Sequence, residues 1–211
     1  MPRKKRIWYP GATYHVMSRG NRRMAIYKDE EDYLYFLDII KMTREIYDFW
    51  IHSICMMTNH YHMEIETADV ELWRIMQKIN SIYSGKFNLE HNCSGHLFEG
   101  RYTACLIEDE GYFLEVSRYI HLNPVKAKMV REPIDYKYSS YNMFVGKKED
   151  RSQGKVGRVI AEIVDTGRIM SIFGEDPHEH YRKFVEGRIS HEEQEMQIMK
   201  DMKENELWLP E

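Results

Sequence analysis

Residues 56–66 read Met-Met-Thr-Asn-His-Tyr-His-Met-Glu-Ile-Glu, an alternation that predicts a β-strand with two unlike faces. Residues i and i+2 of a strand point to the same side. One face is therefore mostly apolar and carries Met57, Asn59, Tyr61, Met63 and Ile65. The other face is polar and carries Thr58, His60, His62, Glu64 and Glu66. The apolar face is expected to pack on a core, and the polar face places two imidazoles beside carboxylates, which suits a divalent metal.

The elements around this strand follow a recognisable order. Apolar spacing predicts strands over 13–19, 49–56 and 98–107 and helices over 30–47, 69–87 and 108–123. With the strand that contains His60, the first six elements match the ferredoxin-like pattern. We expect an α+β fold in which a four-stranded antiparallel sheet carries two helices on one face. The third helix would then cover part of the other face.

The pattern weakens after residue 125, and this predicts a division of the chain. Residues 1–145 are expected to form the main domain. Residues 146–157, rich in Gly and Lys, are predicted to be a linker. Residues 158–211 are predicted to be a small helical C-terminal extension of unknown role.

Composition limits the class of protein. No run of about 18 apolar residues occurs in the 211-residue chain, so we expect no membrane span and no membrane partner. The three cysteines are not spaced as a CxxC pair, which fits a reducing cytoplasm rather than a disulfide framework. The net charge is −4, but residues 1–28 hold eight basic residues and no acidic one. A local basic patch can bind phosphates whatever the total charge.

The predicted third helix supplies further candidates for chemistry. Tyr119 and Asn123 are four residues apart, so they share a helix face. An Asn amide oxygen can complete a cation site beside two imidazoles. A tyrosine hydroxyl can act as a covalent nucleophile, although its ordinary pKa of about 10 means that it needs a nearby cation or base. His-x-His also occurs by chance, and most of the 15 tyrosines must be packing residues.

Four ordered segments resemble one family. They are PGATYHVMSRGNRR (10–23), MTNHYH (57–62), GHLFEGRY (95–102) and SRYIHLNPVKA (117–127). Together they resemble the single-tyrosine HUH transposases, and within them the REP-associated tyrosine transposase branch. The resemblance covers roughly residues 8–145 and does not extend clearly over the last sixty.

The resemblance implies an HUH nuclease architecture and a mechanism. His60 and His62 would hold Mg²⁺ or Mn²⁺ against a phosphate of single-stranded DNA, with Asn123 as a third ligand. Tyr119 would attack the phosphorus and form a 5′-phosphotyrosine, which a 3′-hydroxyl could later reverse to join strands. The DNA targets of the family often fold as hairpins. The family has a bulky aliphatic residue where this chain has Tyr61, a position on the apolar face where the change should do no harm.

Basic and aromatic residues near the ends of the predicted strands are candidate DNA contacts. They are Arg19, Asn21, Arg22, Arg23, Arg101 and Tyr102. Phosphate contacts give salt-sensitive affinity that depends little on sequence. Arg101 could instead pair with a surface carboxylate such as Glu99 or Glu108.

Two other functions remain open at this stage. One is a metal-dependent hydrolase in which His60, His62 and Glu64 hold Zn²⁺ or Fe²⁺ and water is the nucleophile. The other is a non-catalytic module that binds single-stranded nucleic acid. The oligomeric state is also open between a monomer and a homodimer.

Overall fold

A four-stranded antiparallel sheet, in the order β2-β3-β1-β4, forms the centre of the computed structural model, which describes residues 7–146, 154–187 and 196–201. The strands are β1 (Thr13–Arg19), β2 (Phe49–Met57), β3 (His60–Thr67) and β4 (Thr103–Ile107). Every neighbouring pair is antiparallel. The order of strands is that of the ferredoxin-like fold, and the expected α+β class is confirmed.

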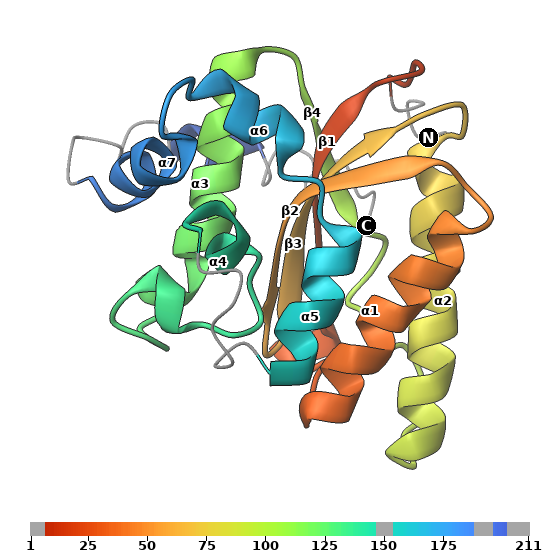
Figure 1. Cartoon of the computed structure of the whole chain (residues 1–211). Helices are drawn as coiled ribbons and strands as arrows, with labels where there is room; N and C mark the ends of the chain where they lie inside the picture. The colour runs from red at the N-terminus through yellow and green to blue at the C-terminus, as the bar shows by residue number, and fades with distance from the viewer. Residues whose placement is uncertain (1–6, 147–153, 188–195, 202–211) are drawn as a thin grey trace.

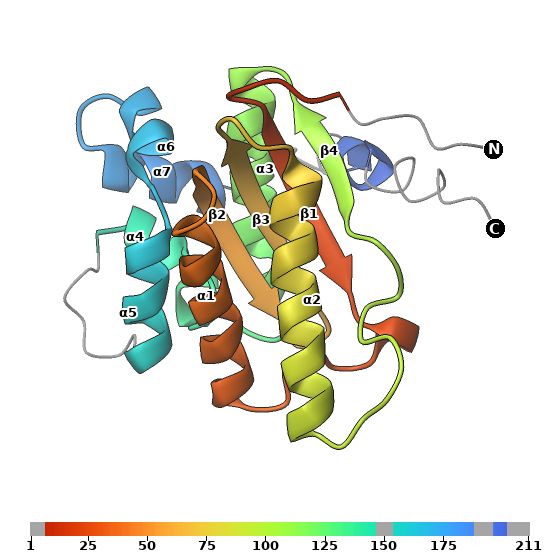
Figure 2. The ribbon, with the colours of Figure 1, turned by 90° about the vertical axis from the view of Figure 1, so that its right-hand side faces the viewer.

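Helices cover both faces of the sheet. α1 (Glu30–Arg44) and α2 (Leu72–Glu90) lie on one face, and α3 (Glu110–Lys126) lies on the other (Figure 1). Figure 2 shows α1 and α2 side by side in front of the sheet, with α3 behind it. Asp29 caps α1, because its Oδ1 accepts a hydrogen bond from the Asp32 backbone N–H at 3.0 Å.

The end of α3 differs from the prediction. The sequence places it near Asn123, before Pro124, but the helix continues through Pro124 to Lys126. A proline inside a helix removes one backbone hydrogen bond. Here that loss is confined to the last turn, and the buried ring of Pro124 adds apolar contact.

The β2–β3 pair is a hairpin, with Thr58 and Asn59 as the turn between the paired residues Met57 and His60. The strand predicted over 56–66 is therefore interrupted at these two residues, and β3 begins at His60. Its apolar face packs on the layer of α1 and α2. Tyr61 is fully buried there, with its ring centre 4.8 Å from that of Phe36. Its hydroxyl donates to Asn80 Oδ1 at 2.7 Å. Tyr61 therefore lies on the core side of the sheet, where its size does not crowd the polar face.

The C-terminal part of the described chain is helical. It contains η2 (Pro133–Asp135), α4 (Tyr141–Phe144), α5 (Gly154–Ile163), α6 (Gly167–Ile172) and α7 (Pro177–Glu186). Of the predicted linker, residues 147–153 lie outside the described residues. Residues 154–157 form the first turn of α5, so for them the linker prediction is wrong; Val156 is buried and gives this turn a core contact.

These helices belong to the same hydrophobic core as the sheet. Ile160, Ile169 and Tyr181 are fully buried in it. α5 runs beside α1 (Figure 2), and Arg44 Nη1 donates to the carbonyl oxygen of Ile163 at 3.0 Å. The segments around Ser139 and Val164 pair with β2 and cover its edge. The C-terminal helices thus complete the packing of the sheet.

The composition predicts no membrane span and no disulfide framework. Within the described ranges, no helix has the length and apolarity to cross a bilayer. All three cysteines are unpaired, with Cys55 and Cys105 buried and Cys93 exposed.

Candidate active site

Two histidines of β3 face α3. His60 and His62 alternate along the strand and lie on the sheet face opposite α1 and α2. Their ring centres are 5.1 Å apart and their planes are nearly perpendicular. His62 is buried and His60 is half-buried. The predicted pair therefore exists as a compact group of imidazoles on one face.

Both rings are held in the neutral form. Burial lowers the pKa of His60 to about 4, and the positive charge of Arg19 lowers it further. Burial also lowers the pKa of His62 well below its ordinary value, with smaller contributions from His60 and His15. A neutral imidazole has a lone pair that a cation can bind. The donor chemistry of this pair therefore fits a divalent metal.

Each histidine uses its Nδ1 in a hydrogen bond with a neighbour. His60 Nδ1 lies 2.7 Å from Asn59 Oδ1, and His62 Nδ1 lies 3.0 Å from His15 Nε2. His15 is fully buried in β1. His15 is not among the site residues predicted from the sequence. Only the register of β1 on β3, which pairs Met17 with His62 and His15 with Glu64, brings it to the site.

Tyr119 reaches the same group from α3. Its half-buried ring meets His62 edge-on with 5.5 Å between ring centres, and it meets His15 with 5.7 Å. The ammonium nitrogen of Lys126 lies 4.8 Å from the centre of the Tyr119 ring. The structure thus brings the predicted nucleophile into contact with His62, whose ring neighbours that of His60, although Tyr119 and His62 lie far apart in the chain.

Asn123 lies one turn after Tyr119 on α3. Its Nδ2 donates to the carbonyl oxygen of Tyr119 at 2.8 Å. That bond orients the amide and leaves Oδ1 as the atom of this side chain that could bind a cation. Tyr112, another tyrosine of α3, donates instead to Asp201 Oδ2 at 2.8 Å, and burial raises its pKa.

Glu64 is poorly suited to the role of base or ligand in a hydrolase. It is fully buried, its Oε2 accepts from Ser53 Oγ at 2.9 Å, and burial raises its pKa well above the ordinary value. No group of three His, Cys, Asp or Glu side chains placed to hold a metal occurs in the part of the chain that the structure describes. The geometry therefore does not favour a His60–His62–Glu64 centre.

Most of the predicted DNA contacts gather beyond the end of β1. Arg19 pairs with His60 across the strands and is half-buried, while η1 (Asn21–Arg23) is exposed. The loop before β4 runs alongside, since the backbone N–H of Glu99 donates to the carbonyl oxygen of Arg19 at 2.9 Å. Arg101 is an exposed residue of that loop, two positions after Glu99.

Gly20 makes this sharp turn possible. A Cβ at this position would lie 2.2 Å from the backbone oxygen of Met24, so a larger residue would force the turn open. Arg22 and Arg23 that follow both have positive φ, 53° and 59°. The turn therefore presents two guanidinium groups from a backbone that is bent back on itself.

Tyr102 does not join these residues. It is 6% exposed and belongs to the hydrophobic core. A nucleobase can stack only on an aromatic ring that is exposed to solvent. The prediction that Tyr102 contacts DNA is therefore not supported, because alternation along the chain places its ring inward while Arg101 points out.

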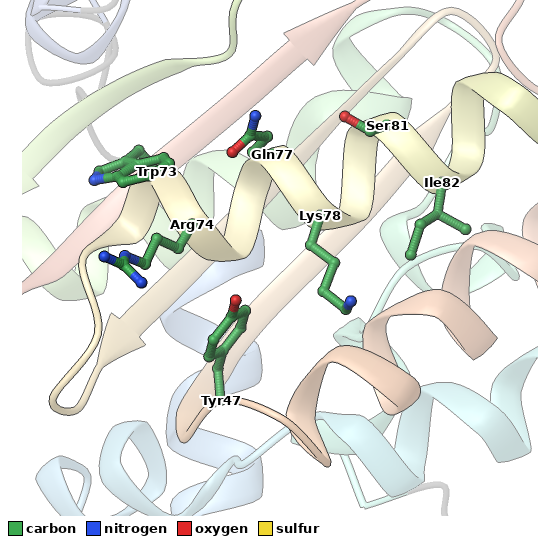
Figure 3. Close-up of a pocket in the computed structure, with 7 residues that line it drawn as sticks. All are labelled: Tyr47, Trp73, Arg74, Gln77, Lys78, Ser81 and Ile82. Carbon is green, nitrogen blue, oxygen red and sulfur yellow. The ribbon is translucent and has the colours of Figure 1, made fainter.

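A shallow groove runs along the outer side of α2 (Figure 3). It is lined by Tyr47, Trp73, Arg74, Gln77, Lys78, Ser81 and Ile82. α2 lies on the sheet face opposite α3, so this groove is separate from the group formed by His60, His62 and Tyr119.

Comparison with known proteins identifies the family of the chain. The family model described as IS200-like transposase matches residues 9–123, more than half of the chain and a range that includes His60, His62, Tyr119 and Asn123. No match was found among the curated proteins.

One solved structure with a TM-score above 0.5 shows the same fold. The structure of a REP-associated tyrosine transposase bound to a REP hairpin is 18% identical, with a TM-score of 0.60, and the match covers 74% of this chain and 90% of that one. A putative transposase from Deinococcus radiodurans is 13% identical, with a TM-score of 0.40 over 56% of this chain and 95% of that one. The family match over residues 9–123 establishes that the chain belongs to the IS200-like transposase family.

Proposed function

We propose that this transposase cleaves and rejoins single-stranded DNA through a covalent bond to Tyr119, in the manner of the REP-associated tyrosine branch. The observation that carries the proposal is the meeting of Tyr119 with His62, edge-on at 5.5 Å between ring centres, on a face that also holds His60. Tyr119 from α3, the proposed nucleophile, thus lies beside a pair of neutral imidazoles from β3.

The proposed reaction is the one that the resemblance to the single-tyrosine HUH transposases implies. The phenolic oxygen of Tyr119 attacks a DNA phosphorus and loses its proton, and the bond from phosphorus to the 3′-oxygen breaks. The 5′-phosphate is then bound to Tyr119, and the departing 3′-oxygen takes up a proton. Attack by a second 3′-hydroxyl reverses the step, joins the strands and restores the phenol. The phosphodiester energy is retained in the adduct, so no nucleotide cofactor is needed.

His60, His62 and Asn123 would hold the divalent metal, Mg²⁺ or Mn²⁺. When bound, it would polarise a phosphoryl oxygen as a Lewis acid. The protein's own contribution is to keep both imidazoles neutral and to set Tyr119 beside them. Lys126, with its ammonium 4.8 Å from the Tyr119 ring centre, is proposed to favour the loss of the phenolic proton by adding positive charge near that ring.

The DNA substrate is proposed to be single-stranded with a hairpin. The similar transposase of known structure is bound to a REP hairpin. In this chain, Arg19, Asn21, Arg22, Arg23 and Arg101 are the proposed contacts with the DNA backbone. Whether one copy or a homodimer carries out the reaction can be read from the mass of the protein–DNA complex in solution.

The test is to incubate the protein with Mg²⁺ or Mn²⁺ and labelled hairpin DNA with single-stranded flanks, and to look for an adduct that survives denaturation. Wild type should form it and Tyr119→Phe should not. Tyr112→Phe is the matched control, because it also lies on α3 and should leave the adduct intact. An adduct in Tyr119→Phe that disappears in Tyr112→Phe would move the nucleophile to Tyr112.

Other outcomes separate the remaining functions. Cleavage without any adduct would favour a hydrolase with water as the nucleophile. Binding without cleavage under every metal condition would indicate a non-catalytic nucleic-acid module. His60→Ala should abolish cleavage and keep most of the DNA affinity, because phosphate contacts by basic residues supply most of that affinity. Equal loss of binding and cleavage in His60→Ala would contradict this division.

A further inference from the structure

The geometry assigns Asn59 and His15 as positioning residues: they hold His60 and His62 in the orientation and tautomer that present both Nε2 atoms to a divalent cation. This inference rests on the proposed function, since it concerns the same metal site. It adds two residues that contact neither the DNA nor the cation. Partners of this kind fix the ring orientation of metal-binding histidines in many proteins.

The contacts of Asn59 fix the proton of His60. Asn59 Nδ2 lies 3.0 Å from the carbonyl oxygen of Arg23, which can only accept a hydrogen bond. The amide nitrogen must therefore face Arg23, and the amide oxygen faces His60 Nδ1 at 2.7 Å. That oxygen can only accept, so His60 carries its proton on Nδ1. Its Nε2 is left with a lone pair.

His15 occupies the corresponding nitrogen of His62, and there the direction of the hydrogen bond is set only when a cation binds Nε2. His15 Nε2 lies 3.0 Å from His62 Nδ1, and both side chains are buried. This contact occupies Nδ1 of His62, so only Nε2 can reach a cation. A cation on Nε2 requires the proton of His62 to be on Nδ1, and His15 Nε2 is the acceptor for that proton. The ring of His15, tilted by 31° to that of His62 at 5.1 Å between centres, also limits how His62 can rotate.

The two supports come from different parts of the chain. Asn59 belongs to the β2–β3 turn and is tied to the carbonyl of Arg23, in the turn that also carries the proposed DNA contacts. His15 belongs to β1, the neighbouring strand. Each ring has its own support, Asn59 for His60 and His15 for His62. The Nε2 atoms are therefore held in place before a cation binds, and less conformational entropy is lost on binding.

Paired substitutions test each support in the full-length protein. His15→Gln keeps an acceptor near the place of Nε2, whereas His15→Phe removes it. Asn59→Asp keeps the acceptor oxygen, whereas Asn59→Ala removes it. Mn²⁺ affinity is measured by calorimetric titration without DNA. We expect His15→Phe and Asn59→Ala to bind Mn²⁺ about 10- to 100-fold more weakly than wild type. His15→Gln should stay within about threefold of wild type on the same scale. Asn59→Asp keeps the acceptor for His60 but loses the donor to Arg23, so its affinity should fall between those of Asn59→Ala and wild type.

A second measurement needs no substitution in the supports. Imidazole ¹⁵N NMR of histidine-labelled wild type in EDTA reports which ring nitrogen carries the proton, with His60→Ala used for assignment. The proton of His60 is expected on Nδ1. A proton found on Nε2 would overturn the role of Asn59, even if a variant of Asn59 failed to fold.

The outcomes separate this inference from the proposed function. Unchanged Mn²⁺ affinity in Asn59→Ala and His15→Phe would contradict only the positioning roles. Unchanged affinity in His60→Ala would contradict the metal site itself. Tyr119→Phe should bind Mn²⁺ as wild type does, because Tyr119 is assigned to the covalent step and not to the metal.

Discussion

The hydroxyl oxygen of Tyr181, in α7, lies 2.7 Å from Nδ1 of His121, in α3. It also lies 2.5 Å from the hydroxyl oxygen of Ser117. All three side chains are fully buried. Ser117 and His121 are two residues before and two residues after Tyr119, so they point to the opposite side of the helix. Hydrogen bonds therefore join α7 to the side of α3 that faces away from Tyr119, the proposed nucleophile.

Tyr181→Phe should lower the free energy of unfolding by about 1–3 kcal/mol. The substitution keeps the ring but removes the hydroxyl, which leaves Ser117 Oγ and His121 Nδ1 without this buried partner. Denaturant unfolding measures the change. Tyr9→Phe is the control, since Tyr9 is 46% exposed. Removal of its hydroxyl should change the free energy of unfolding by no more than about 0.5 kcal/mol. Equal stability of the two variants would show that the buried bonds contribute nothing.

Glu64→Gln should be at least as stable as wild type at pH 7, measured in EDTA. Burial raises the pKa of Glu64 well above 4.5, so the folded protein binds its proton more tightly than the unfolded chain does. The contribution of Glu64 to wild-type stability therefore falls as pH rises above about 4.5, and a neutral Gln removes that penalty. The Gln variant should also form the DNA adduct, because Glu64 has no chemical role in the proposed reaction.

Glu66→Gln is the matched control on the same strand, with the opposite sign. Glu66 Oε2 accepts from His52 Nε2 at 2.9 Å and pairs with Arg168 at 2.5 Å. Loss of its charge should destabilise the protein by up to about 1 kcal/mol, as expected for a partly exposed ion pair. Strong destabilisation by Glu64→Gln would mean that Glu64 is ionised in the folded protein, contrary to the direction of its pKa shift.

Lys126→Gln should slow adduct formation by about 3- to 10-fold with little change in Mn²⁺ affinity. Its ammonium lies 4.8 Å from the Tyr119 ring centre, where a positive charge favours the loss of the phenolic proton. Single-turnover kinetics of the adduct give the rate. Lys128→Gln changes the charge by the same amount just beyond the helix end and should leave the rate near that of wild type. Equal slowing in both variants would indicate a general loss of DNA attraction.

The fold was predictable because its signals are local. Alternation marks β3, apolar spacing marks α1 and α2, and a side-chain cap marks the start of α1 at Asp29. The placement of His60 and His62 on one face of β3 follows from that alternation alone. The element order places the third helix over the polar face of the sheet, but the choice of Tyr119 as the residue that meets the histidines required the family resemblance.

The remaining features depend on contacts between distant segments. His15 meets His62 only through the register of two strands, and alternation within one strand says nothing about its neighbour's register. Burial of Tyr102 and the bond from Tyr181 to His121 likewise arise from tertiary packing. Weak periodicity after residue 125 suggested an appendage. Yet Val156, Ile160 and Ile163 place one face of α5 in the core, where it packs on α1.

The exposed turn at Arg22 and Arg23 should set much of the salt dependence of DNA binding. Each guanidinium that contacts a phosphate of single-stranded DNA contributes about 0.7 to the slope of log affinity against log salt concentration. Arg22→Gln and Arg23→Gln should each reduce the slope by about that amount and weaken all sequences alike. Fluorescence anisotropy over a range of salt concentrations measures the slope. Lys155→Gln, an exposed charge on α5, should leave it unchanged. An equal change in all three variants would mean that the overall charge of the protein, and not this turn, governs binding.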